Sequence, residues 1–349
     1  MKQKGGLRML DEMKVLSRIA PDLMADIGRR AQVLSSIEVM QPVGRRALAA
    51  RLNLPEREVR AAAAMLKELG LISMDAAGMQ LTSQAIEVLA GAHDLSRAMF
   101  GLTKLEQALS QLLSVPHVIV VSGNADTDPQ VMREVGRAAA HRVHKLLQSG
   151  MTLAVTGGRT MSEMAHGMQS ATSMNVMVVP ARGGMGSSVE TQASAVAAEI
   201  ARRIGGHYRV MHLPDSLDAA ALQEMMKLPD VRETLELLQR ADLVVHGIGR
   251  ADAMAQRRRL SIDDMEILRK KKAVGEAFGD FFDSDGKTVL KTSTVTLGIG
   301  KVNKGTKMVA VAAGERKAEA IIAATRHETH DSLITDEAAA QKIVAILKS

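Results

Sequence analysis

Apolar residues near the N-terminus recur at helical spacing on both sides of a short break. Residues 8–40 carry such a pattern and are predicted to form an amphipathic helix. Farther along, Leu48 and Leu52 face one side of a short helix. Pro55 then suits the first turn of the next helix, where its missing N–H costs no hydrogen bond. The apolar positions of that helix are Val59, Ala62, Ala63, Leu66 and Leu69. Two short helices joined by a tight break are typical of a helix-turn-helix, whose second helix enters the DNA major groove.

The segment after the second helix has the pattern of a β-hairpin. Residues 73–82 form two short extended runs around a turn that contains Gly78, which predicts a wing and hence a winged helix-turn-helix. The outward side chains of the two helices are basic, and arginine contacts both phosphates and base edges in DNA. We expect Arg57 and Arg60 to reach base edges. The predicted DNA-contacting residues are Arg45, Arg46, Arg51, Arg57 and Arg60.

From residue 115 onward, short apolar runs alternate with segments of helical length. This alternation predicts an α/β domain with a Rossmann-like, mostly parallel sheet covered by helices on both faces. The predicted strands are Val118–Val121, Leu153–Val155, Val176–Val179, Arg209–Leu213, Leu243–Val245, Met308–Ala312 and Leu333–Thr335. The predicted helices are Pro129–Leu147, Thr160–Met168, Val189–Ile204, Asp230–Arg240, Met254–Lys270, Arg316–Ala324 and Asp336–Leu347. Ligands of such sheets bind outside the carboxyl ends of the strands.

These patterns divide the chain into three parts. A winged helix-turn-helix domain is expected over residues 1–92, a linker helix over residues 93–114 and an effector-binding domain over residues 115–349. The linker segment carries an apolar stripe that includes Leu102 and Leu109. Such a stripe suits either packing on the larger domain or a contact between two copies of the chain.

Composition narrows the class of partner. The 349 residues carry a formal net charge of +6, which favours a polyanionic partner. Aromatic residues make up 1% of the chain. Proteins that hold single-stranded nucleic acid stack its bases on aromatic rings, so duplex DNA is the expected nucleic acid. The chain has no cysteine, no apparent export signal and no apolar run long enough to span a bilayer, which fits a cytoplasmic protein without a membrane partner.

Five glycine-containing loops lie at or near the predicted strand ends. Residues 156–160 join a strand to a helix, and the free N–H groups of a helix N-terminus attract anions, so this loop is predicted to cradle a phosphate. The candidate residues for an anionic ligand are Thr156, Gly157, Gly158, Arg159, Thr160, Arg182, Gln192, Arg257, Glu276 and Lys317. The alternatives are an ordinary glycine-rich turn, a surface arginine, a capping glutamine, a solvated basic helix end and a turn glutamate.

Catalytic and metal chemistry have less support. A general base near the strand ends would be Asp242, His246 or Glu276, and none of them has a clear partner in the sequence. A sugar-phosphate isomerase or deaminase therefore stays the alternative to a regulator. His327–Asp331 contains metal-ligating residue types, but we expect a polar loop and no metal.

Eight stretches spread over nearly the whole chain together resemble the SorC/DeoR-type family of sugar-responsive bacterial repressors. They are Glu38–Arg60, Val120–Gly123, Val155–Thr160, Val179–Gly184, Val245–Arg258, Gly275–Gly279, Lys317–Ala320 and Thr335–Glu337. The resemblance implies an N-terminal winged helix-turn-helix and a C-terminal domain with the fold of sugar-phosphate isomerases, which binds an effector instead of converting a substrate. We expect a homodimer or homotetramer bound to double-stranded operator DNA.

Within this family, the chain resembles the repressors of glycolytic operons. That resemblance implies fructose-1,6-bisphosphate as the effector and no cofactor. It places the effector contacts at Thr156, Gly157, Gly158, Arg159, Arg182, Gln192, Arg257, Glu276 and Lys317. One position departs from the glycolytic members, which have threonine where this chain has Arg159. The arginine either adds a salt bridge to the same phosphate or indicates another sugar phosphate and another sugar operon.

Overall fold

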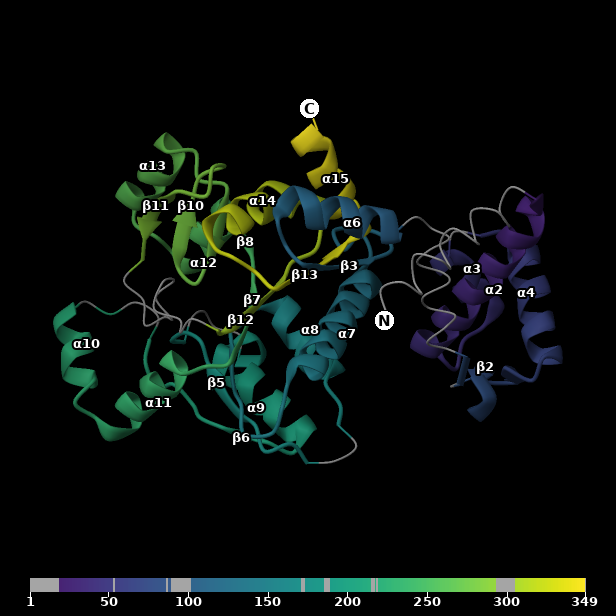
Figure 1. Ribbon diagram of the computed structural model, residues 1–349, viewed down its shortest axis with the longest axis horizontal. Coiled ribbons are helices and arrows are strands. Elements are labelled where there is room, and N and C mark those ends of the chain that lie inside the picture. The colour runs from purple at the N-terminus through teal and green to yellow at the C-terminus, as the bar shows by residue number, and fades with distance from the viewer. Residues whose placement is uncertain are drawn as a thin grey trace. The chain divides into compact units, whose positions relative to one another are not determined.

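Two compact units make up the chain. A computed structural model describes residues 19–52, 54–85, 87–88, 102–170, 173–184, 189–214, 217, 219–292 and 305–348 (Figure 1). The units are residues 1–104 and residues 105–349, and each has its own hydrophobic core. Residues 8–18 of the predicted N-terminal helix and residues 93–101 of the predicted linker helix lie outside the described residues. No described helix combines the length and apolar character needed to cross a membrane.

The first unit has the predicted helix-turn-helix and hairpin. Its elements are α2 (Pro21–Met40), α3 (Arg45–Leu52), α4 (Glu56–Glu68), β1 (Ile72–Asp75) and β2 (Gly78–Leu81). The two strands pair antiparallel, and Asp75 Oδ1 accepts the N–H of Ala77 (2.8 Å) and of Gly78 (3.1 Å) to close the turn. Leu48, Val59, Ala62, Ala63 and Leu66 are buried in the shared core, as the apolar spacing predicted. Leu52 is half-buried, and Leu69, which follows the end of α4, is 52% exposed, so its predicted inward position is wrong.

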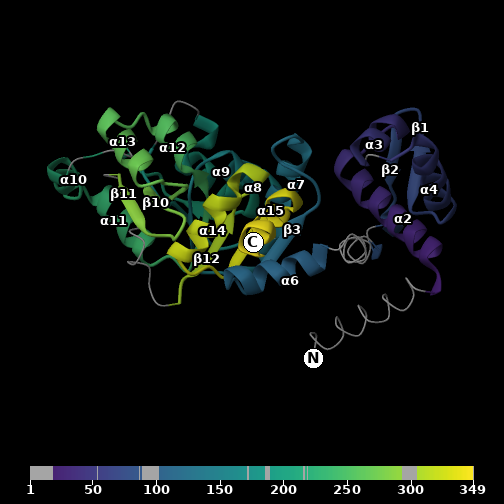
Figure 2. The same cartoon turned by 90° about the horizontal axis from the view of Figure 1, so that it is seen from above.

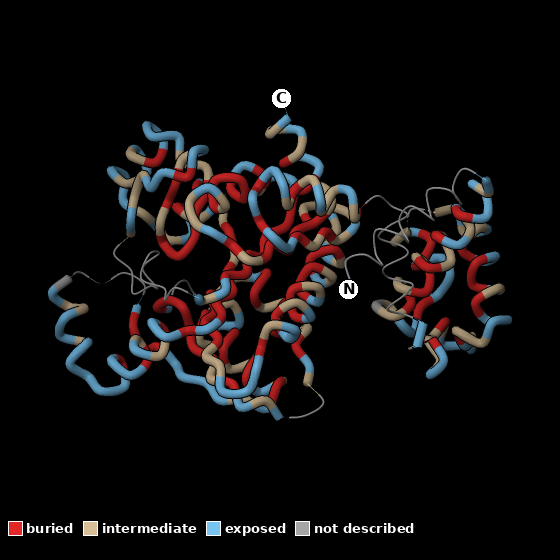
Figure 3. Tube along the Cα trace, in the orientation of Figure 1, coloured by how far each residue is buried: buried red, intermediate tan, exposed pale blue. Residues whose placement is uncertain are grey.

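A seven-stranded parallel sheet forms the centre of the second unit. Its strands are β3 (His117–Val121), β4 (Thr152–Val155), β5 (Met177–Pro180), β6 (His207–Tyr208), β7 (Leu243–Gly247), β12 (Lys307–Val311) and β13 (Ser332–Asp336). They are ordered β3-β13-β12-β7-β4-β5-β6. Figure 3 shows that the central strands are buried, as their continuous apolar runs predicted.

One predicted strand is wrong. Arg209–Leu213 was expected in the sheet, but the edge strand β6 consists of His207 and Tyr208. The N–H of Arg209 still bonds to Val178 O (3.1 Å). Beyond it, the N–H of Met211 donates to Ser194 Oγ (3.2 Å), near the start of the helix Ala193–Ile204. The apolar side chains of Met211 and Leu213 are therefore buried without strand pairing.

Helices cover the sheet on both faces. Apart from two helices next to the small sheet described below, the helices of the second unit are α6 (Leu102–Leu113), α7 (Pro129–Leu146), α8 (Arg159–Gly167), α9 (Ala193–Ile204), α10 (Ala219–Met225), α11 (Pro229–Gln239), α14 (Ala318–His327) and α15 (Glu337–Lys348), with short 3-10 turns η1 (Val189–Thr191) and η2 (Glu315–Lys317). Helices α7, α8 and α9 share one core with the strands, and α14 and α15 lie on the opposite side (Figures 1 and 2). The single helix predicted over Val189–Ile204 is wrong at its start, because the structure has two elements there, η1 and α9.

Helix α6 packs along the free edge of the sheet. The outer strand β3 has one neighbouring strand, β13. On its other side Glu106 Oε1 accepts the N–H of Val120 at 2.7 Å. A covered edge does not present unpaired backbone groups to another chain.

A small antiparallel sheet follows β7 and was not predicted. Its strands β8 (Gly249–Arg250), β9 (Gly275–Ala277), β10 (Asp280–Phe282) and β11 (Thr288–Lys291) are ordered β11-β10-β9-β8. Between β8 and β9 lie α12 (Ala251–Arg258) and α13 (Ile262–Lys270). The predicted single helix Met254–Lys270 is wrong, because Arg259 adopts a left-handed conformation (φ 52°) and Ser261 caps a new helix by accepting the N–H of Asp264 (3.1 Å).

Two buried histidines meet in the second unit, His246 in β7 and His330 two residues before β13. The Nε2 atoms of His246 and His330 are 2.9 Å apart. Each ring also directs its Nδ1 to a backbone carbonyl: His330 Nδ1 lies 2.8 Å from Glu328 O, and His246 Nδ1 lies 3.2 Å from Gly247 O. Burial lowers the pKa of both imidazoles below the ordinary value of 6.5. Both rings are therefore neutral at pH 7.

This pair makes stability depend on acid pH. In the unfolded chain the two rings bind protons once the pH falls below about 6.5, whereas the folded protein resists protonation. The free energy of unfolding should therefore fall as the pH drops from 6.5 to 5, by about 1.4 kcal/mol per pH unit for each suppressed proton. The free energy of unfolding, measured with urea at each pH, should depend less steeply on pH in His330→Asn than in the wild type. The control His144→Asn, on an exposed face of α7, should keep the wild-type slope; an unchanged slope in His330→Asn would contradict the assignment.

Candidate functional site

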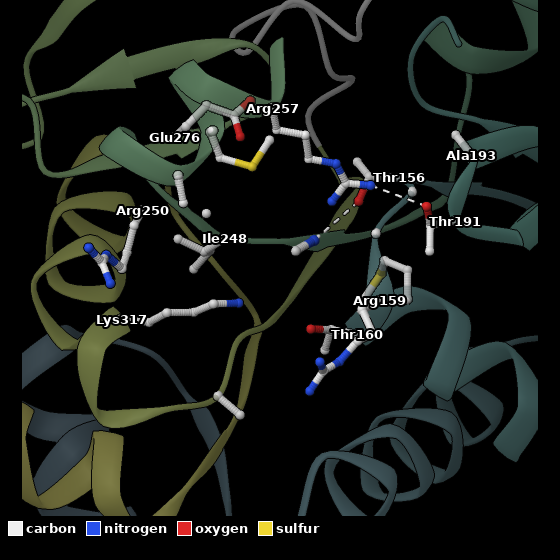
Figure 4. A pocket seen from close by; sticks show the side chains of 18 of the residues that line it. Thr156, Arg159, Thr160, Thr191, Ala193, Ile248, Arg250, Arg257, Glu276 and Lys317 are labelled. Carbon is white, nitrogen blue, oxygen red and sulfur yellow. Dashed lines mark hydrogen bonds between the residues drawn. The ribbon is translucent and has the colours of Figure 1, made fainter. Parts of the chain in front are cut away.

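A cavity of about 470 Å³ lies at the carboxyl edge of the parallel sheet (Figure 4). Strands β4 and β7 are neighbours in the sheet. After β4 the chain adds β5 on one side of this pair, and the strand next to β7 on the other side is β12. The cavity therefore lies at a switch point of the kind where α/β proteins bind ligands. Its lining includes all ten residues predicted for the anionic ligand, which are Thr156, Gly157, Gly158, Arg159, Thr160, Arg182, Gln192, Arg257, Glu276 and Lys317. The structure thus brings loops from distant parts of the sequence to one cavity.

The loop after β4 presents a helix N-terminus to the cavity. Helix α8 begins at Arg159 and has no side-chain cap, which leaves first-turn N–H groups for a ligand. Thr156 Oγ1 accepts the N–H of Gly247 at 3.1 Å, so its own hydrogen is available to donate. A Cβ on Gly157 would lie 2.3 Å from Thr191 O, and this close approach explains why the loop needs glycine.

Buried charges form the side of the cavity next to the small sheet. Arg182 is 7% exposed and Glu276 is 3% exposed, so neither is the surface arginine or the turn glutamate of the alternative interpretation. Glu276 lies in β9, and its Oε1 is 3.7 Å from Arg182 Nη1. Arg258 also donates to Glu276 Oε1. Arg258 has no distinct signal in the sequence, because it stands in a run of three arginines.

Arg257 and Gln192 lie near the loop after β4. Arg257 Nη2 donates to Thr191 Oγ1 at 3.2 Å, as the dashed line in Figure 4 shows. Gln192 directly precedes α9 and makes no capping hydrogen bond with its side chain. Met185 and Gly186, which belong to the predicted loop after β5, lie outside the described residues.

Lys317 closes the third side. It ends η2 at the start of α14, and Figure 4 shows its ammonium group directed into the cavity. Burial lowers the pKa of Lys317, and the positive charge of Arg159 acts in the same direction, whereas Asp126 and Asp336 oppose it. A nearby anion would restore the ordinary pKa, so this lysine favours a negatively charged ligand.

Three further charged residues of the lining stand outside the predicted set of ten. They are Asp126, Arg250 and Arg316; Arg250 and Arg316 belong to two of the five predicted loops, whereas Asp126 was not singled out from the sequence. Asp126 accepts hydrogen bonds from the backbone N and from Nη2 of Arg316, each at 3.0 Å. With them, the lining carries six cationic side chains and two carboxylates. This surplus of four positive charges suits a ligand with more than one anionic group.

The first unit exposes arginines on the helix-turn-helix. Arg45 and Arg46 on α3 and Arg57 and Arg60 on α4 are exposed, whereas Arg51 is half-buried. Glu56 holds two of them, since Oε1 lies 3.3 Å from Arg60 Nη2 and Oε2 lies 3.7 Å from Arg46 Nε. These are surface ion pairs, which contribute little to stability and exchange readily.

The comparisons with known proteins agree with both units. Residues 97–345 match the family described as "Putative sugar-binding domain", and residues 23–96 match the "CggR N-terminal DNA binding domain". A helix-turn-helix unit joined to a sugar-binding domain defines a DNA-binding transcriptional regulator. The chain is 39% identical over 335 residues to the central glycolytic genes regulator of Priestia megaterium (strain DSM 319 / IMG 1521), covering 95% of this chain and 98% of the relative.

Further relatives and solved structures agree. The central glycolytic genes regulator of Bacillus subtilis (strain 168) is 37% identical over 329 residues, which cover 94% of this chain and 96% of that protein. A SorC family transcriptional regulator from Enterococcus faecalis is 38% identical, with a TM-score of 0.65 over 69% of this chain and 99% of that one. The chain therefore belongs to the SorC-type family of transcriptional regulators. Its relatives are named as regulators, so the isomerase or deaminase alternative is not supported.

The close approach at Gly157 yields a prediction for the site. Gly157→Ala should displace the Thr191 backbone and cost on the order of 2 kcal/mol or more of unfolding free energy, as overpacking does. Thermal or urea unfolding measures the loss. The matched control is Gly247→Ala, where the nearest atom to a new Cβ is Val311 O at 3.9 Å and the change should be small. Equal stability of the two variants would contradict the close packing.

Proposed function

We propose that the chain is a cytoplasmic repressor of a glycolytic operon that releases its operator when a sugar phosphate, fructose-1,6-bisphosphate foremost, fills the cavity. The observation that carries this proposal is the surplus of positive charge in a cavity built at the switch point of the sheet. Two relatives described above are central glycolytic genes regulators, which supports the choice of genes. The cavity supports the choice of ligand by its charge.

Cations reach the cavity from several elements. Figure 4 shows Arg159 at the start of α8, Lys317 and Arg257 around the cavity, and Arg182 also lines it. A phosphate ester carries a charge of about −1.5 to −2 near pH 7, so two phosphates approximately match the surplus. Gln192 in the same lining offers an amide to sugar hydroxyls. A bisphosphate therefore fits this cavity better than a sugar with one phosphate.

Ligand binding then acts on the population of DNA-binding assemblies. Helix-turn-helix proteins bind two half-sites as dimers, so we propose a homodimer or homotetramer on the operator. An effector shifts such an equilibrium only as far as it prefers one state over the other. We propose that the sugar bisphosphate favours the state with weaker operator contacts.

The direct test measures operator binding with and without the sugar. Fructose-1,6-bisphosphate should raise the thermal midpoint of the wild type and weaken its binding to a duplex from the upstream region of the operon. Arg182→Ala should abolish both effects, because a buried cation of the cavity lining is lost. The control Arg202→Ala removes a surface arginine paired with Glu199 and should change neither. Unchanged operator affinity at saturating sugar would contradict the proposal. A larger shift with another phosphosugar would favour the alternative effector, to which Arg159 points.

The proposed DNA contacts give a second test. We propose that Arg45, Arg46, Arg51, Arg57 and Arg60 contact DNA. Arg57→Ala should weaken operator binding by about 1–3 kcal/mol and random duplex binding much less, because a base contact is lost. Arg46→Ala should weaken both equally and lower the slope of log affinity against log salt by about one, as a lost phosphate contact does. Fluorescence anisotropy over a salt series distinguishes the two patterns; identical behaviour of the variants would refute the assigned roles.

A further inference from the structure

Two adjacent arginines at the end of α12 have opposite surroundings. Arg257 lines the cavity, whereas the side chain of Arg258 is 3% exposed and lies behind the cavity wall. Arg258 Nη1 donates to Thr292 Oγ1 at 3.2 Å, and its Cζ lies 5.9 Å from the centre of the Phe281 ring. Its Nη2 donates to Glu276 Oε1. Arg258 is therefore held on three sides, and its charge faces one carboxylate.

Glu276 accepts from both sides of the wall. Its Oε1 receives the N–H of Gly279 at 2.7 Å and the guanidinium of Arg258, and it lies 3.7 Å from Arg182 Nη1 on the cavity side. The contact to Arg258 is the closer of the two ion pairs. A buried carboxylate requires a partner charge, and Arg258 meets that requirement. This group of two arginines and one glutamate carries a net positive charge.

We infer that Arg258 is a positioning residue that neutralises Glu276 from behind the wall and so leaves the charge of Arg182 for the anion in the cavity. The inference rests on the proposed function, because it assigns Arg182 to an anionic effector. Among the described residues, Arg182 and Arg258 are the cations within 4 Å of Glu276. Without Arg258, Glu276 keeps Arg182 as its one cationic partner among the described residues, so the existing ion pair tightens and less of the charge of Arg182 acts on the anion.

A cycle of variants tests this role in the full-length chain. Arg258→Met should weaken the binding of fructose-1,6-bisphosphate and of inorganic pyrophosphate, which has no hydroxyl groups, by about tenfold or more in titration calorimetry. Adding Glu276→Gln to Arg258→Met should restore most of the pyrophosphate affinity, because no carboxylate remains to draw Arg182 away. Arg258→Lys keeps the charge and should keep most of the affinity. A purely structural role predicts that the double variant binds no better than Arg258→Met.

Two controls make the result decisive. Thr292→Val removes the hydrogen bond from Arg258 Nη1 without changing charge, and Arg202→Met removes a surface charge of the same kind. Both variants should bind pyrophosphate as the wild type does. Wild-type affinity in Arg258→Met, or no recovery in the double variant, overturns the inference. The wild type could bind pyrophosphate with this dependence on Arg258 and not bind fructose-1,6-bisphosphate. That result would refute the proposed effector and support the role of Arg258. A wild type that binds neither anion overturns both.

Discussion

The carboxylate of Asp336 fixes the edge of the sheet on which the cavity depends. It is fully buried at the end of β13, where Oδ2 accepts the N–H of Ala125 (2.6 Å) and Oδ1 accepts those of Gly314 (3.0 Å) and Ala339 (3.2 Å). One side chain thereby joins the loops after β3 and β12 and the first turn of α15. Because a buried carboxylate without such donors is strongly unfavourable, these loops have one arrangement. The same loops carry Asp126 and Lys317 to the cavity.

The cavity brings cationic side chains together, and two carboxylates offset part of the repulsion between them. Asp126 neutralises Arg316, and Glu276 is shared by Arg182 and Arg258. Lys317 has the lowered pKa that burial near Arg159 causes. These ion pairs offset part of the repulsion among the cations, and positive charge remains in the lining. A site of this kind gains stability from an anion in proportion to its charge, which is the differential interaction that a ligand-controlled equilibrium requires.

The sequence predicted the parts of this fold where one pattern dominates. Continuous apolar runs such as Leu243–Val245 indicate buried parallel strands, and a glycine-rich turn before a helix indicates an anion site at any α/β switch point. The small sheet β8–β11 escaped prediction because its strands have two to four residues and their pairing depends on tertiary contacts. The break between α12 and α13 had a signal, since Ser261 stands three residues before Asp264 as a helix cap does. The burial of Arg258 had none, because its neighbours are also arginines.

Arginine has two different roles in the two units, and burial separates them. On the helix-turn-helix, Arg46 and Arg60 share Glu56 with their side chains 92% and 62% exposed. Such pairs contribute about 0–1 kcal/mol, so a DNA phosphate can replace the glutamate at little cost. At the cavity wall, Arg258 and Glu276 are 3% and 5% exposed by side chain, and removing one partner of a buried pair costs several kcal/mol. The exposed arginines are thus free to exchange partners, whereas the buried ones hold a fixed geometry. A net charge of +6 reveals neither arrangement, because it counts both kinds of arginine alike.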